Sequence, residues 1–243
     1  MLRSAAGFFF PSRCLGCHTS SVERFFRGGV CEACWTALER PSAIRCGVCD
    51  EPLGSPGVPG REGAAKRCGR CILSPPPYRT LAGAAPYRGI AREILIAVKF
   101  GGADFLAPRL AEVMTERLVL PPRVEEIAAV PATARARRSS DHAAELLADA
   151  VANRLGLPFD RRRLRKLRST ARQSGLPLSE RQGNVREAFR AAPGAPRRVL
   201  LVDDVATSGA TARECARALR RAGAETVDVW CFARASRDDL LLR

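Results

Sequence analysis

The chain has 243 residues, of which 46% are hydrophobic, enough to bury the core of one ordinary domain and a small additional module. Its formal net charge of +15 makes an anionic partner such as nucleic acid plausible, but an aromatic content of 6% gives no evident platform for stacking unpaired bases. No apolar run reaches the roughly 18 residues that a membrane-spanning helix needs, so we expect no membrane insertion.

The N-terminal segment 1–13 carries a short apolar patch that ends at Pro11. The patch is at the lower limit for the apolar region of a signal peptide, and no clear small-residue cleavage site follows it. We therefore expect a short helix that packs on the main domain, and a cytoplasmic protein.

Eight of the ten cysteines form four C-x-x-C pairs. The pairs are Cys14 and Cys17, Cys31 and Cys34, Cys46 and Cys49, and Cys68 and Cys71. A C-x-x-C turn directs two thiolates to one point, and two such turns complete a tetrahedral zinc site. The pattern predicts up to two zinc ions in closed, structural sites. The spacing fits either a sequential grouping of the pairs or a crossed one, in which the first joins the third and the second joins the fourth.

Two other uses of these cysteines compete with zinc. A disulfide framework needs an oxidising compartment, and no export signal is evident. A redox role does not call for four copies of the motif. The two remaining cysteines, Cys215 and Cys231, fall on a predicted helix face and in a predicted strand, and we interpret them as core residues. His18 could replace one thiolate, but with so many cysteines available we interpret it as a bystander.

A change in composition near residue 74 predicts a domain boundary. Residues 1–73 hold every C-x-x-C pair and little helical periodicity, and residues 54–63, rich in Gly and Pro, are predicted to form a loop. The stretch from Ser74 to Pro77 is a stiff spacer. We expect a zinc-binding module at 1–73, a proline-rich linker at 74–77 and a second domain at 78–243.

Predicted strands and helices alternate beyond the linker. The strands cover 81–87, 126–130, 199–202 and 226–232, and the helices cover 90–100, 103–117, 141–155 and 211–222. This alternation predicts an α/β fold with a mostly parallel sheet and helices on both faces. Ligands bind such sheets at the carboxyl ends of the strands.

The segment VLLVDDVATSGAT, residues 199–211, carries the most specific chemistry. An apolar run is followed by Asp203 and Asp204, then by a turn of small residues before a predicted helix. The turn consists of Thr207, Ser208, Gly209, Ala210 and Thr211. A strand, a small-residue turn and a helix N-terminus form an anion site from backbone N–H groups and the helix dipole. Small residues also let a phosphate approach the backbone closely.

The two acids give this site a second half. Carboxylates accept hydrogen bonds from vicinal hydroxyls, and a magnesium ion nearby offsets their charge. Sugar hydroxyls on one side and a 5′-phosphate on the other describe a phosphorylated ribose. The competing interpretation is a generic strand–turn–helix in which the acids cap the helix. A capping role does not explain why two adjacent acids are followed by the specific sequence TSGAT, so we favour the phosphorylated ribose.

The segment 199–211 closely resembles the PRPP-binding motif of type I phosphoribosyltransferases, with Ala206 where the family usually has a larger aliphatic residue. Other segments fit the same picture: Lys99 to Gly102, Val130-Pro131, Gln173 with Leu176, Glu180-Arg181, and Asn184 to Phe189. With four C-x-x-C pairs in front, this order resembles the ComF family of competence-associated proteins over nearly the whole chain. A family motif, R-G-F-N-Q, maps to Arg138–His142, which departs from it as RSSDH.

The resemblance implies a zinc ribbon module joined to a type I phosphoribosyltransferase-like domain. Asp203 and Asp204 would hold the ribose hydroxyls or the magnesium shell, and residues 207–211 would take the 5′-phosphate. The cationic candidates for pyrophosphate are Lys99, Arg135, Arg137, Arg138 and Arg172. A chain with only two histidines suits this chemistry, because the protein mainly positions charge around an oxocarbenium-like transition state.

Two functions of different class follow. The first is an enzyme that transfers phosphoribose from PRPP, with magnesium, to an unidentified nitrogen acceptor. The second is a non-catalytic, PRPP-sensing protein that handles single-stranded DNA during uptake, alongside a helicase partner; the association with competence is implied by the resemblance alone. The dense basic run at 161–168 fits either a solvated face or a nucleic-acid contact.

Overall fold

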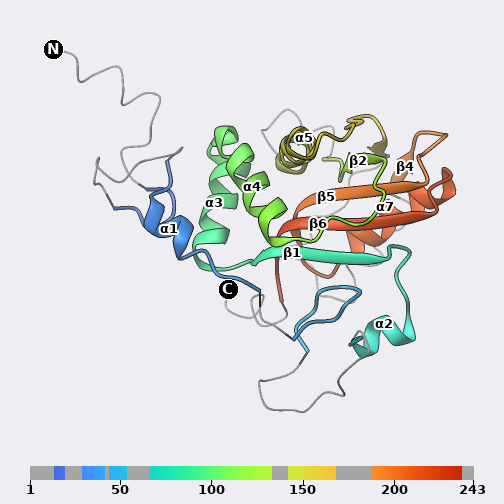
Figure 1. Ribbon diagram of the computed structural model, residues 1–243, viewed down its shortest axis with the longest axis horizontal. Helices are drawn as coiled ribbons and strands as arrows, with labels where there is room; N and C mark the ends of the chain where they lie inside the picture. Colours follow the sequence, from blue (N-terminus) through green and yellow to red (C-terminus); the bar gives the residue numbers. More distant parts are fainter. Residues whose placement is uncertain are drawn as a thin grey trace.

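A four-stranded parallel sheet forms the centre of the protein (Figure 1). The computed structural model describes residues 14–19, 29–41, 44–53, 66–132, 142–167 and 188–236. Within these, the strands are β1 (Thr80–Pro86), β2 (Glu126–Ala129), β5 (Arg198–Ala206) and β6 (Thr226–Arg234), in the order β1-β6-β5-β2. All three neighbouring pairs run parallel. Strand β5 is therefore internal, and its carboxyl end opens between two neighbours.

The strands carry apolar side chains on both faces of the sheet, because other elements of the fold cover each face. In β5, Leu200 and Val202 belong to one buried cluster, whereas Val199 and Leu201 belong to another. Successive side chains of a strand point to opposite faces, so the two clusters are the cores on the two sides of the sheet. A continuous apolar run is the pattern expected of such a doubly covered parallel strand.

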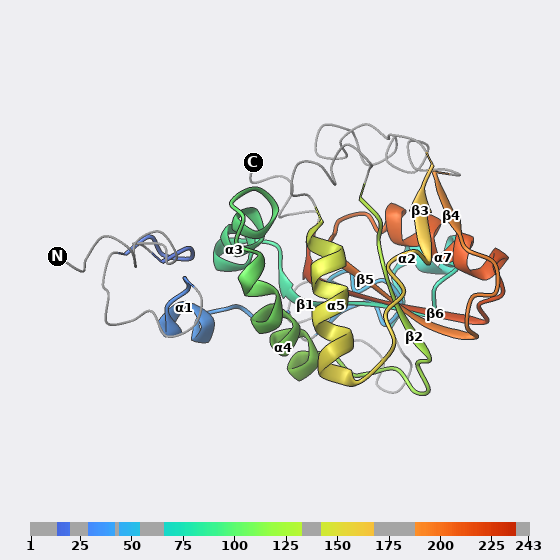
Figure 2. The same ribbon diagram turned by 90° about the horizontal axis from the view of Figure 1, so that it is seen from above.

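Three helices pack on one face of the sheet. They are α3 (Gly89–Phe100), α4 (Ala107–Arg117) and α5 (Ala143–Leu155). Figure 2 shows them side by side, and the interior of this layer includes Ile94, Leu110 and Leu147, all fully buried. A short 3₁₀ turn, η3 (Asp104–Leu106), leads into α4. The sequence predicted one helix over 103–117; the first part of it takes this tighter turn instead.

The opposite face carries α7 (Ala210–Arg221) and a small antiparallel ribbon of β3 (Leu164–Lys166) and β4 (Phe189–Ala191). Cys215 of α7 and Cys231 of β6 are fully buried in this second core, which confirms their interpretation as core residues. Helix α7 and the ribbon lie next to each other in both views (Figures 1 and 2). This ribbon was not predicted from the sequence.

The N-terminal part contributes two short helices, each starting directly after a cysteine. Helix α1 (Glu32–Thr36) follows Cys31 and α2 (Gly69–Leu73) follows Cys68. Trp35 of α1 is buried with the core of α3 and α4. Elsewhere, the Leu81 N–H donates to Val48 O and the Gly83 N–H donates to Asp50 Oδ2, so residues 48–50 cover the outer edge of β1.

The structure confirms the predicted fold class: a mostly parallel sheet with helices on both faces, preceded by a cysteine-rich module. One prediction needs correction, because the strand expected at 199–202 continues to Ala206 and the two acids lie inside it. The expected N-terminal helix within 1–13 falls outside the described residues, and the boundaries at 74 and 77 stay predictions. No helix in the described part of the chain has the length and hydrophobicity to cross a bilayer.

Candidate functional site

Asp203 and Asp204 lie next to each other near the carboxyl end of β5. Each carboxylate is largely buried, with 8% and 7% of the residue exposed. After burial, the charge of Asp203 is the main cause that raises the pKa of the Cys215 thiol, so Asp203 approaches α7, whereas Asp204 reaches toward α3. There the Asp204 Oδ2 is 2.6 Å from the Lys99 Nζ near the end of α3. The side chains therefore reach the same strand end from two layers of the fold.

The acid pair carries more negative charge than its described surroundings neutralise. Burial, and then the negative charge of Asp204, raise the pKa of Asp203 well above its usual range, although Lys99 acts in the opposite direction. The Asp203 Oδ1 also accepts a hydrogen bond of 2.9 Å from the Asp204 N–H. Two carboxylates beside one ammonium can take up a divalent cation or the hydroxyls of a sugar.

The turn that follows β5 has the backbone of an anion site. Gly209 has φ of 72°, in the left-handed region, and it is the N-cap of the twelve-residue α7. The Ser208 Oγ accepts a hydrogen bond from the Ala210 N–H at 3.3 Å. A Cβ at Gly209 would lie 3.3 Å from the Tyr78 hydroxyl, so the turn is also closely packed. The N–H groups at the start of α7 point out of the helix end, and together with the helix dipole they make this end attractive to a phosphate.

A buried arginine braces the start of this turn. Arg234, the last residue of β6, is 1% exposed. Its guanidinium donates to the Ala206 carbonyl at 3.1 Å and also to the Thr207 carbonyl. Sequence reasoning did not identify Arg234; the available signal was a charged residue directly after the apolar run VWCFA, residues 229–233.

The structure places only part of the predicted cationic group. Lys99 lies at the acid pair, as described. The four arginines expected at the pyrophosphate are outside the described residues: Arg135, Arg137, Arg138 and Arg172. Asp141 also falls outside, and His142 lies 3.3 Å from the Asp104 Oδ2 rather than at the acid pair.

The first cysteine cluster brings together Cys14, Cys17, Cys31 and Cys34. Their Sγ atoms lie within 4.8 Å of one another, with 3.7 Å between Cys14 and Cys34. Zn–S bonds of about 2.3 Å in a tetrahedron separate the sulfurs by roughly 3.8 Å, so the cluster fits zinc. The Thr19 hydroxyl lowers the pKa of the Cys17 thiol to about 6, which favours the thiolate that a metal needs. His18 is exposed and is not a member.

The second cluster consists of Cys46, Cys49, Cys68 and Cys71, so the grouping is sequential rather than crossed. The Sγ atoms of Cys49 and Cys68 are 3.6 Å apart. Although burial acts to raise it, backbone N–H groups led by that of Cys68 bring the pKa of the Cys46 thiol down to about 7. Both clusters use four protein ligands, which leaves a bound zinc no open position for catalysis.

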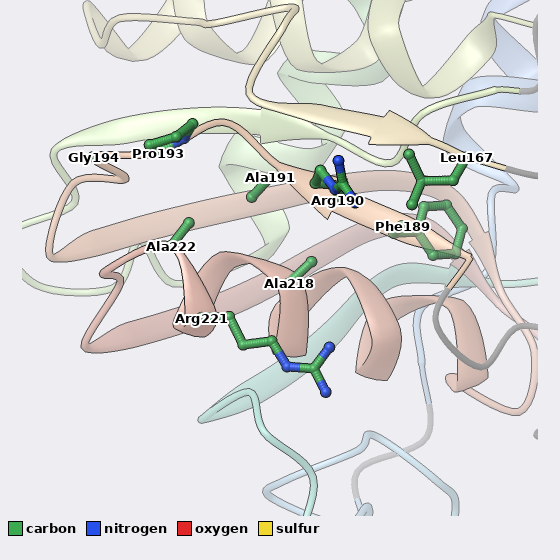
Figure 3. Close-up of a pocket in the computed structure, with 9 residues that line it drawn as sticks. All are labelled: Leu167, Phe189, Arg190, Ala191, Pro193, Gly194, Ala218, Arg221 and Ala222. Atoms are coloured by element: carbon green, nitrogen blue, oxygen red, sulfur yellow. The ribbon is translucent and has the colours of Figure 1, made fainter.

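A separate pocket of about 510 Å³ lies between the ribbon and α7. Figure 3 shows Phe189 and Arg190 on the β4 side and Ala218, Arg221 and Ala222 on the α7 side. None of its lining residues belongs to the acid pair or to the turn before α7. Apart from Arg190 and Arg221, the side chains that line it are apolar.

Comparison with known proteins gives matches at both ends of the chain. Residues 5–72 match the family described as double zinc ribbon domain, and residues 141–241 match the phosphoribosyl transferase domain. The DNA utilization protein YhgH of Salmonella typhi is 31% identical over 214 residues, which cover 85% of this chain and 90% of that protein. Competence protein F of Haemophilus influenzae is 28% identical over 241 residues, which cover 93% of this chain and 99% of that protein.

Part of the chain also aligns with solved structures. Glutamine phosphoribosylpyrophosphate (PRPP) amidotransferase from B. subtilis, complexed with ADP and GMP, aligns with 26% identity and a TM-score of 0.37. The alignment covers 53% of this chain and 26% of that one.

Proposed function

The chain belongs to the ComF family, and on that premise we propose that it binds PRPP with magnesium and transfers the phosphoribosyl group to a nitrogen acceptor. The observation that carries the proposal is the position of Asp203 and Asp204, which sit at the end of an internal parallel strand directly before the left-handed turn at Gly209. Few other ligands need both an acid pair and a phosphate turn at adjoining backbone positions.

Each half of this arrangement takes one part of the substrate. Asp203 and Asp204 accept hydrogen bonds from the ribose hydroxyls or complete the magnesium shell, and residues 207–211 bind the 5′-phosphate. Lys99 holds the Asp204 carboxylate in place and supplies positive charge beside it. Arg135, Arg137, Arg138 and Arg172 are the proposed contacts of the pyrophosphate.

The reaction breaks the bond between C1 of the ribose and the pyrophosphate oxygen, and forms a bond between C1 and the acceptor nitrogen, whose proton passes to the departing pyrophosphate or to solvent. Pyrophosphate leaves with the electron pair, so positive charge develops on the sugar in the transition state. A bound magnesium ion would neutralise charge on the departing pyrophosphate. The buried carboxylates stabilise the developing positive charge because water is largely excluded around them.

Titration calorimetry with magnesium and PRPP tests the binding site. The double variant Asp203→Asn with Asp204→Asn is expected to lose binding and to stay folded, whereas Glu225→Gln, an exposed acid outside the site, is expected to bind normally. Unchanged affinity for PRPP in the double variant would refute the assignment of these two acids to the PRPP site. Isotope exchange between pyrophosphate and PRPP, with nucleobases and amines as acceptors, then separates an enzyme from a sensor that does not turn over.

A second function, the handling of single-stranded DNA, is favoured by the pocket between β4 and α7. Arg165 and Arg190 are directly opposite each other in the ribbon, and like charges in that position repel. Among the described residues, neither these two nor Arg221 has an acidic side chain within ion-pair distance. A row of phosphates would offset this charge. The relatives' names, DNA utilization protein and competence protein, support a link to DNA uptake.

The salt dependence of binding tests this second function. For an unpaired strand the slope of log affinity against log salt is about −0.7 per phosphate contact, so Arg190→Gln with Arg221→Gln should reduce its magnitude by about 1.4. Arg197→Gln is the control, because Arg197 is already paired with Glu225. An equal slope in both variants would exclude the pocket as a DNA contact.

The wider organisation follows the sequence analysis as a proposal: a zinc ribbon module at 1–73, a linker at 74–77 and the phosphoribosyltransferase-like domain at 78–243. Thiolate clusters that hold zinc need a reducing environment, which supports a cytoplasmic location. A helicase of the DNA uptake machinery is the proposed protein partner.

A further inference from the structure

The guanidinium of Arg234 connects the second cysteine cluster to the turn that we assign to the 5′-phosphate. On one side it donates to the Cys49 carbonyl at 3.2 Å and to the Glu51 Oε2 at 2.7 Å. On the other side it donates to the carbonyls of Ala206 and Thr207, the last residue of β5 and the first of the turn. A zinc-ligand residue and the phosphate turn are therefore bonded to one side chain.

These bonds fix the direction of the turn's own donors. In a planar trans peptide, the carbonyl of one residue and the N–H of the next point in opposite directions. With the carbonyls of Ala206 and Thr207 held toward Arg234, the N–H groups of Thr207 and Ser208 point away from it. Arg234 thus orients two of the backbone donors at the start of the turn.

The position of Arg234 depends on the cysteine module, because a buried charge needs a partner. The side chain has 0% exposure, and Glu51 is the carboxylate that forms an ion pair with it among the described residues. A buried arginine without its partner is strongly unfavourable, so Arg234 moves if Glu51 moves. Gly83 permits the close approach of β1, since a Cβ there would lie 2.7 Å from the Arg234 Cβ.

Cluster geometry holds Glu51 and the Cys49 carbonyl in place. Both belong to the segment that starts at Cys46, where the Cys46 N–H donates to the Glu51 carbonyl at 2.8 Å and closes a turn around the cluster. The four sulfurs of this cluster would be drawn together by a bound zinc. Without metal, the thiolates repel and this turn loses its main constraint.

We propose that Arg234 is a positioning residue through which the second zinc module sets the conformation of the 5′-phosphate turn, so that phosphate affinity depends on this module and not on the first. The inference rests on the proposed function of the turn. The first module offers the natural comparison: its Glu39 forms an exposed ion pair with Arg88 at the start of α3. Its two hydrogen bonds join Arg88 to Glu39 at the surface, at the start of α3.

Glu51→Gln and Glu39→Gln form a matched pair of variants, each removing one carboxylate of a cysteine module that binds an arginine of the main body. Two ligands are titrated by calorimetry: ribose 5-phosphate, which needs the turn, and magnesium pyrophosphate, which does not. Glu51→Gln is expected to weaken the binding of ribose 5-phosphate about tenfold or more and to leave the affinity for magnesium pyrophosphate unchanged. Glu39→Gln is expected to change neither. A general loss of structure would weaken both ligands together.

Hydrogen exchange of the peptide that spans 206–211 gives a readout without any ligand. Glu51→Gln, and Cys68→Ser with its zinc content measured, should speed exchange there, while Glu39→Gln should not. If the wild type binds neither ligand, the proposed function fails and the exchange data alone decide on the coupling. Equal exchange and equal ribose 5-phosphate affinity in Glu51→Gln and Glu39→Gln would overturn the inference; where Cys68→Ser does not fold, the two glutamate variants decide.

Discussion

Replacing Asp203 by asparagine should make the protein more stable and, at the same time, unable to bind PRPP. Burial and the neighbouring Asp204 raise the pKa of Asp203, so its ionised form is disfavoured in the folded state. Asparagine is nearly isosteric, and its Oδ1 can still accept the hydrogen bond from the Asp204 N–H. The substitution therefore removes a charge and leaves the local geometry in place.

The size of the gain follows from the two charges. At an effective dielectric constant near 20, two like charges about 4 Å apart repel by about 4 kcal/mol, and the repulsion falls as their separation grows. Lys99, 2.6 Å from Asp204, offsets part of this repulsion. We expect a gain of about 1–2 kcal/mol in the free energy of unfolding, or about 2–8 °C in Tm for a chain of this size.

The gain should depend on pH in one direction. A carboxyl whose pKa is raised on folding costs no stability below its unfolded pKa, about 3.9, and costs progressively more as the pH rises toward the folded pKa. The Tm of Asp203→Asn should therefore be close to that of the wild type near pH 4 and higher than that of the wild type at pH 8, as measured by calorimetric melts at both pH values. Magnesium and PRPP should raise the Tm of the wild type only. A gain that is absent, or equal at both pH values, would refute this account of Asp203.

Three further predictions address the rest of the molecule. Elemental analysis should find about two zinc ions per chain, and a metal-free folded protein would refute the interpretation of the cysteine clusters. Gly209→Ala should lower the free energy of unfolding by about 1–2 kcal/mol in denaturant titrations, because φ of 72° is strained for alanine and its Cβ would crowd Tyr78; an unchanged midpoint would contradict the turn geometry. Lys99→Met leaves two buried acids without this cation, and should cost about 1–3 kcal/mol at pH 8 and less at pH 5; a pH-independent loss would point to packing alone.

The sheet and the acid-plus-turn segment were predictable because short-range patterns encode them. The apolar run before Asp203 indicates a buried parallel strand, and the glycine and hydroxyl residues after it indicate a turn into a helix. The end of that strand was not predictable in the same way. Asp203 and Asp204 break the apolar run, but pairing with β6 continues to Ala206 because the neighbouring strand supplies the hydrogen bonds.

Other features depend on contacts between residues far apart in the chain. The ribbon of β3 and β4 has only three residues per strand, and its basic composition resembles a solvated surface. Arg234 gives no local signal of its partners, since Glu51 and Cys49 are more than 180 residues away. The grouping of the cysteines was open for the same reason: spacing fixes each C-x-x-C turn but not which turns meet in space.

The cover that residues 48–50 provide over β1 has a consequence for the metal-free protein. Loss of zinc from the second cluster would free this segment and leave the N–H groups of Leu81 and Gly83 without their acceptors. An uncovered strand edge can pair with the same edge of another molecule. Chelation should therefore promote self-association of the chain, in addition to any effect on ligand affinity.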